Sequence, residues 1–105
     1  MTRPHYLDAL QKVGVLSSLA RFDPRVAGTP PLGLDLPDSD IDVLCHAPDP
    51  KDFALAVWAA FGNHPGFAAR QWVSGGRPVI ANFEAEGWTF EVFGSRQPAE
   101  EQIGW

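Results

Sequence analysis

The chain has 105 residues, which favours a single domain, because a second hydrophobic core of independent stability would not fit in so short a length. Apolar residues make up 45% of the sequence, a composition typical of a folded globular protein and not of a disordered one. The formal net charge is −5 and the eight basic residues are scattered singly, so we do not expect long nucleic acid as a partner.

The first part of the chain is predicted to be helical. Apolar residues recur at helical spacing between residues 2 and 12, and Pro4 stands in the first turn, where its missing N–H costs little. Gly14 interrupts this spacing, residues 15–19 continue it over one or two further turns, and Pro24 ends it. We therefore expect two short helices, or one helix that breaks at Gly14.

A short strand at residues 25–27 is predicted to run into a loop rich in Pro and Gly. Residues 40–46 alternate and then become apolar, which predicts a largely buried strand whose first residues emerge at the end of the sheet. Asp49 and Pro50 are typical of a helix start, and a helix is expected over residues 50–62. We expect this helix to bury Phe53, Val57, Trp58 and Phe61.

The rest of the chain predicts a meander of three strands, at about residues 67–73, 78–84 and 88–93. Ser-Gly-Gly and Glu-Gly turns join them, and residues 95–105 resemble the start of a further element. The expected fold class is α+β, with a mixed or antiparallel sheet of about four or five strands. Helices should pack on one face of the sheet, and the carboxylates described below should lie on the other.

Several features bear on compartment and assembly. No apolar run approaches the roughly 18 residues of a membrane-spanning helix, and the N-terminus lacks the apolar stretch of a signal peptide, so we expect no membrane and a cytoplasmic protein. The single Cys45 stands beside His46, but no second Cys or suitably spaced His follows, which favours a buried small residue over a metal ligand. A domain this small would also gain stability from a homodimer or another partner.

Asp40 and Asp42 are the first residues with a chemical signature. They are two apart on a predicted strand, so their side chains leave the same face roughly 6 to 7 Å apart. At an effective dielectric constant of about 20, two ionised carboxylates at that range repel by roughly 2 to 3 kcal/mol. Mg²⁺ binds one or two carboxylates together with substrate phosphates, so a cation between them is the simplest explanation of the pair.

Other residues would complete such a site. Gly28 and Thr29 follow the strand at 25–27; glycine lets a phosphate approach the backbone N–H, and the threonine hydroxyl is a further donor. Glu91 lies in the middle of a predicted strand with apolar residues on both sides, and a third carboxylate would allow a second metal ion.

These motifs resemble the nucleotidyltransferase superfamily. That superfamily carries a hydrophobic-Gly-Gly/Ser signature, then Asp-hydrophobic-Asp/Glu about ten residues later, and a third carboxylate between hydrophobic residues on a later strand. The matching segments are Ala27-Gly28-Thr29, residues 40–43 and residues 90–92. The chain resembles still more closely an uncharacterised bacterial family of that fold, over residues 28–42, 90–94 and 98–102.

The resemblance implies Mg²⁺-dependent transfer of a nucleoside monophosphate from ATP or another nucleoside triphosphate to a hydroxyl of a small molecule or protein. Carried over, Asp40 and Asp42 would be metal ligands and Glu91 a third ligand or the base. Three residues would contact phosphate: Gly28, Thr29 and Ser39. The resembled family continues past Gln102 into further helix, whereas this chain ends at Trp105, which fits a short natural version and a truncated one alike.

Each signal has a simpler interpretation. Asp38-Ser39-Asp40 after Pro37 is also a common turn sequence, and Glu91 could face solvent on an antiparallel sheet. Glu84 and Glu86 are rivals for the third carboxylate but sit at a predicted turn. The alternative function is a catalytically inactive module of the same fold that pairs with a helical partner, as in toxin-antitoxin pairs.

Overall fold

A computed structural model describes residues 5–27, 40–71 and 78–96 of the chain. Within them the elements are α1 (Tyr6–Val13), α2 (Val15–Ser18), the 3-10 helix η1 (Ala20–Phe22), β1 (Arg25–Ala27), β2 (Asp40–His46), α3 (Pro50–Phe61), β3 (Ala68–Gln71), β4 (Val79–Ala85) and β5 (Trp88–Ser95). The expected α+β class is confirmed. Three predicted features lie outside the described residues: the Pro/Gly-rich loop, the Ser-Gly-Gly turn and the C-terminal element.

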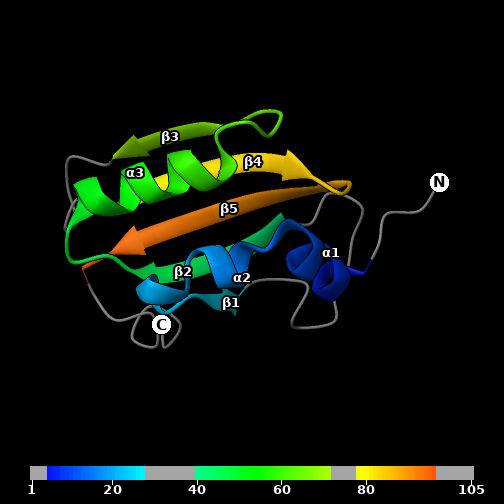
Figure 1. The fold of residues 1–105 in the computed structure, drawn as a ribbon, viewed down its shortest axis with the longest axis horizontal. Helices are drawn as coiled ribbons and strands as arrows, with labels where there is room; N and C mark the ends of the chain where they lie inside the picture. Colours follow the sequence, from blue (N-terminus) through cyan, green and yellow to red (C-terminus); the bar gives the residue numbers. More distant parts are fainter. Residues whose placement is uncertain (1–4, 28–39, 72–77, 97–105) are drawn as a thin grey trace.

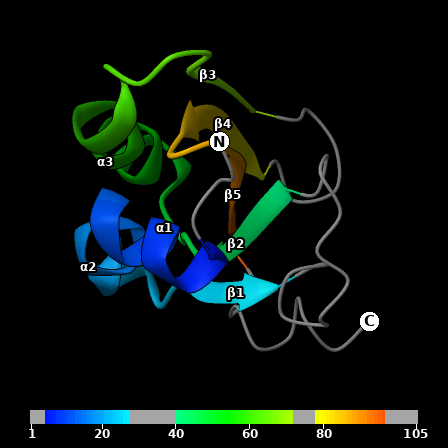
Figure 2. The same cartoon turned by 90° about the vertical axis from the view of Figure 1, so that its right-hand side faces the viewer.

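One mixed sheet contains all five strands, in the order β1-β2-β5-β4-β3 (Figure 1). β2 and β5 pair in parallel, and the other neighbouring pairs are antiparallel. Seen along the edge of the sheet, α1, α2 and α3 all lie on the same face (Figure 2). The expected arrangement of helices on one face is therefore present, and the opposite face is the one that carries the candidate site.

Helix boundaries follow from local capping. The ring nitrogen Nδ1 of His5 accepts the N–H of Leu7 at the start of α1, and Gly14 ends that helix in the left-handed conformation, with φ of 76°. The predicted break at Gly14 is thus confirmed. At the start of α3, the carboxylate of Asp49 accepts a hydrogen bond from the N–H of Lys51 at 3.1 Å, and Pro50 occupies the first helical position. The helix ends before Gly62, as expected.

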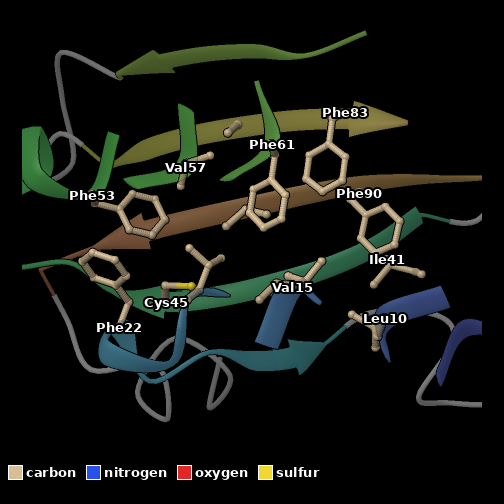
Figure 3. Close-up of a cluster of buried hydrophobic side chains, with 14 of the residues drawn as sticks. Leu10, Val15, Phe22, Ile41, Cys45, Phe53, Val57, Phe61, Phe83 and Phe90 are labelled. Carbon is tan, nitrogen blue, oxygen red and sulfur yellow. The ribbon is translucent and has the colours of Figure 1, made fainter. Parts of the chain in front are cut away.

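The core lies between the sheet and the helices. Side chains alternate across each strand, so every second residue of β2, β4 and β5 points into this layer. Figure 3 shows the aromatic rings at its centre, where Phe61, Phe83 and Phe90 stack with centroids 4.7 and 5.0 Å apart. Cys45 is fully buried in the same cluster, as expected.

One predicted core residue lies outside the core. Phe53, Val57 and Phe61 are buried, but 64% of the Trp58 surface remains exposed. The reason is helical geometry: the three buried residues are four apart and form one stripe, whereas Trp58 is rotated by about 100° from Val57. The indole instead meets the ring of Phe67 edge-on, with centroids 5.4 Å apart.

One glycine allows α3 to approach the sheet closely, and another forms the turn between β4 and β5. Gly94 on β5 faces α3, and a Cβ at this position would come closer than 3.0 Å to the ring of Phe53. Gly87, with φ of 77°, and Glu86, with φ of 54°, form the turn between β4 and β5, so the predicted hairpin turn is confirmed. Because a two-residue turn sets the register of the strands that it joins, it also sets the row in which Glu91 lies.

Candidate metal centre

Asp40, Asp42 and Glu91 lie on the face of the sheet opposite the helices. Asp40 and Asp42 alternate with Ile41, which points into the core, so both carboxylates leave the same face of β2. In the parallel pair of β2 and β5, Asp42 is the direct partner of Glu91. The three side chains are therefore neighbours, although nearly half of the chain separates the two strands in sequence.

Their spacing suits a small divalent cation. One carboxylate oxygen from each residue lies within 4.8 Å of the other two. Octahedral Mg²⁺ holds oxygens at about 2.1 Å, so two oxygens on one ion are about 3 to 4.2 Å apart, and small side-chain rotations would close the remaining distance. All three residues are half-buried, which leaves room for the waters that Mg²⁺ retains.

Electrostatics distinguishes this group from a set of surface acids. Burial, followed by the charges of Glu91 and Asp40, raises the pKa of Asp42 to about 6. A carboxyl group that holds its proton so far above its ordinary range lacks a compensating positive charge. A bound cation would supply that charge and stabilise the ionised form.

An apolar row borders the carboxylates. Two residues further along the same face, Leu44 pairs with Phe93, and Phe93 pairs with Ile80 of β4. Leu44 and Ile80 are buried, with 7% and 2% of their surfaces exposed. This row lowers the polarity beside Asp42, which is consistent with burial being the largest cause of its raised pKa.

The structure brings a fourth polar residue into line, which sequence reasoning missed. Asn82 of β4 pairs with Glu91 on the side away from Asp42, and the three lie in one row across the sheet. The amide nitrogen Nδ2 of Asn82 donates to the carbonyl oxygen of Gly66 at 3.5 Å. A polar residue between Ala81 and Phe83 was the available signal, but the row to which it belongs depends on strand register.

The rival carboxylates lie elsewhere. Glu84 is exposed and pairs with Thr89, which in turn pairs with Asp40. Thr89 therefore stands between the carboxylates of Glu84 and Asp40. Glu86 occupies the turn, and its carboxylate lies 3.9 Å from the ammonium group of Lys12. Of the carboxylates in the described ranges, the residue that joins the two aspartates is Glu91.

Three predicted phosphate contacts, Gly28, Thr29 and Ser39, lie outside the described residues. The last described residue before them, Ala27, pairs with Asp42 at the end of β1. Cys45 points to the helix side of the sheet, and burial, followed by the charge of Asp23, raises the pKa of its thiol to about 12. A thiol with that pKa remains protonated at neutral pH, and Cys45 faces away from the carboxylates.

The fold and the site together define a class: an α+β protein with three clustered carboxylates on one face of a mixed sheet. The chain belongs to the family described as Domain of unknown function (DUF4269), whose sequence profile matches residues 8–105. This membership agrees with the expected resemblance to an uncharacterised family. No curated protein and no solved structure matches the chain. Across the described ranges, each helix is too short or too polar to cross a membrane.

Proposed function

We propose that the chain is a Mg²⁺-dependent nucleotidyltransferase. It would transfer a nucleoside monophosphate from ATP or another nucleoside triphosphate to a hydroxyl group of a small molecule or a protein. The observation that carries the proposal is the group of Asp40, Asp42 and Glu91, whose ligand atoms lie within 4.8 Å of one another on two parallel strands. The spacing of the sequence motifs adds the resemblance to nucleotidyltransferases.

The carboxylates have two tasks in this reaction. Asp40 and Asp42 would hold the metal, whose charge would neutralise the phosphates of the nucleotide when it is bound. The acceptor oxygen attacks the α-phosphorus, the bond from that phosphorus to the bridging oxygen breaks, and pyrophosphate leaves with the electron pair. Glu91 would be either a third metal ligand or the base, and as the base it would accept the proton of the attacking hydroxyl. Positioning and charge neutralisation thus account for the catalysis, with no covalent intermediate on the protein.

Phosphate contacts complete the proposed site. Gly28 and Thr29 would offer a backbone N–H and a hydroxyl group to the triphosphate, and Ser39 a second hydroxyl. The pairing of Ala27 with Asp42 supports this part of the proposal, because Gly28 directly follows Ala27 in the sequence.

Binding of a non-hydrolysable ATP analogue in the presence and absence of Mg²⁺, measured by titration calorimetry, tests the proposal. We expect Mg²⁺-dependent binding by the natural protein and at least about tenfold weaker binding by Asp42→Asn and Glu91→Gln, because each removes a metal ligand. Glu84→Gln is the matched control, since it removes a carboxylate from the same face outside the metal group and should bind as the natural protein does.

Two outcomes would contradict the proposal. Absence of Mg²⁺-dependent nucleotide binding by the folded natural protein would leave the inactive interaction module as the better account. Equal losses in Glu84→Gln and Asp42→Asn would show that acidity of the face, and not the three-carboxylate centre, governs binding. If binding is present, release of pyrophosphate in the presence of candidate acceptors then distinguishes a transferase from a nucleotide-binding protein.

A further inference from the structure

A groove lies between α3 and the edge strand β3, on the side of the molecule that the carboxylates do not use. The chain leaves α3 at Phe61 and returns along β3, so the end of the helix lies near the start of the strand. Trp58 and Phe67 are in contact at that end of the helix. Figures 1 and 2 agree in placing α3 beside β3.

The exposed surface of α3 beside the groove carries an accessible apolar pair. Leu55 and Trp58 each expose 64% of their surfaces and lie three residues apart, on one side of α3. Neighbouring exposed apolar side chains lose their contact with water when another molecule covers them, which favours its binding.

The groove itself is basic. A hollow of about 390 Å³ is lined by Pro50, Lys51, Ala54, Ala69, Arg70, Gln71 and Val79. Lys51 and Arg70 make no ion pair within residues 5–27, 40–71 and 78–96. The nearest acids on α3 are engaged, because Asp49 caps the helix and Asp52 binds Arg21. Two cations that have no acidic partner in the described part of a chain of net charge −5 favour an acidic ligand.

The strand that borders the groove is the last of its sheet. β3 stands at the end of the strand order, and within the described residues it pairs with β4 alone. All four of its residues are exposed. An edge strand offers backbone N–H and C=O groups to an added strand, and the exposed stretch from Ala68 to Arg70 gives an extended peptide a reason to bind beside α3.

We propose that this groove and the exposed surface of α3 beside it bind an extended segment of a partner protein that carries apolar side chains followed by acidic ones. Lys51 and Trp58 are seven residues apart on α3, which corresponds to about 10 Å, or about three residues of extended peptide. The apolar side chains contact Leu55 and Trp58, and the acidic ones reach Lys51 and Arg70. The site does not involve the metal group, so it stands independently of the proposed reaction.

The test uses a fluorescein-labelled nonapeptide with threonine at every odd position and leucine, valine, glutamate and glutamate at successive even positions. Fluorescence anisotropy with the full chain should show saturable binding, and a companion peptide with lysine in place of both glutamates should bind at least about tenfold more weakly. The double variant Lys51→Glu/Arg70→Glu should bind the glutamate peptide more weakly by the same factor, and Trp58→Ala should also lower the affinity for this peptide.

Lys12→Glu/Arg25→Glu is the matched control. It changes the net charge equally but alters α1 and the other edge of the sheet, where both cations already have acidic partners. Binding of the glutamate peptide by this control at the natural affinity supports the proposal. Lack of binding to the natural protein, equal binding of both peptides, or equal loss in both double variants would overturn it. So would tighter binding of a single-stranded oligonucleotide, or a natural dimer that Lys51→Glu/Arg70→Glu dissociates.

Discussion

The raised pKa of Asp42 links the candidate centre to the stability of the metal-free fold. Burial and two neighbouring carboxylates disfavour its ionised form in the native state, and neither factor acts in the unfolded chain. The native protein therefore retains a proton that the unfolded protein loses between about pH 4, the ordinary range of an aspartate, and pH 6. Stability from this group is fully present below that window and is lost as the pH rises through it.

Asp42→Asn isolates this effect. In the absence of divalent cations, we expect the variant and the natural protein to be equally stable near pH 4, and the variant to be more stable by about 1 kcal/mol above pH 6. That figure allows for the solvent that reaches a half-buried carboxyl group. It corresponds to a rise in Tm of about 4–8 °C. Urea unfolding across the pH range measures the difference.

Glu84→Gln serves as the control, because its carboxylate lies outside the group of three and should give no such pH-dependent difference. A difference in free energy of unfolding between Asp42→Asn and the natural protein that stays constant from pH 4 to pH 8 would show that burial and the neighbouring charges do not disfavour ionised Asp42. Greater stability of the natural protein at pH 7 would reverse the electrostatic account of the centre.

At the scale of elements, strong local signals located the helices and strands. Gly14 and Asp49 carry capping chemistry, and the alternation in residues 40–46 gave β2 its observed bounds. The prediction that Trp58 is buried was wrong, because a helix rich in apolar residues has no unique buried side until it packs against the sheet. The apolar flanks of Glu91 and the resemblance led us to expect it near the aspartates, but the row that it shares with Asn82 depends on register, which periodicity alone does not fix.

The close approach of α3 to β5 makes a second prediction. Gly94→Ala should destabilise the fold by about 1 to 3 kcal/mol, because the new methyl group would overlap the ring of Phe53. Urea unfolding at constant pH measures this loss. In a double-mutant cycle with Phe53→Leu, the smaller side chain should offset part of the loss, with a coupling of at least about 0.5 kcal/mol. Strict additivity would place the strain elsewhere.

For the whole molecule, strand order predicts where the fold opens first. β5 and β2 lie inside the sheet with partners on both sides, and most of their inward side chains are fully buried. β3 lies at one edge and all of its residues are exposed. Elements with few buried contacts open at low free energy, so stability should decline from β5 toward β3.

Hydrogen exchange measured by NMR tests this gradient. We expect the hydrogen-bonded amides of β2 and β5 to exchange at least about tenfold more slowly than those of β3. The same measurement after addition of the glutamate nonapeptide should slow exchange in β3 if the groove beside α3 is its binding site. Amides of β3 that are as protected as those of β5 in the free protein would contradict the predicted gradient.

The parallel pairing of β2 with β5 also decides when the three carboxylates meet during folding. The hairpin of β4 and β5 forms from neighbouring segments, but of the three clustered carboxylates it carries one, that of Glu91. Asp42 joins it only when β2 closes against β5 over nearly half of the chain, and contacts so distant in sequence form slowly. A cation held by all three would therefore recognise the completed sheet. It would stabilise the completed sheet and slow its unfolding.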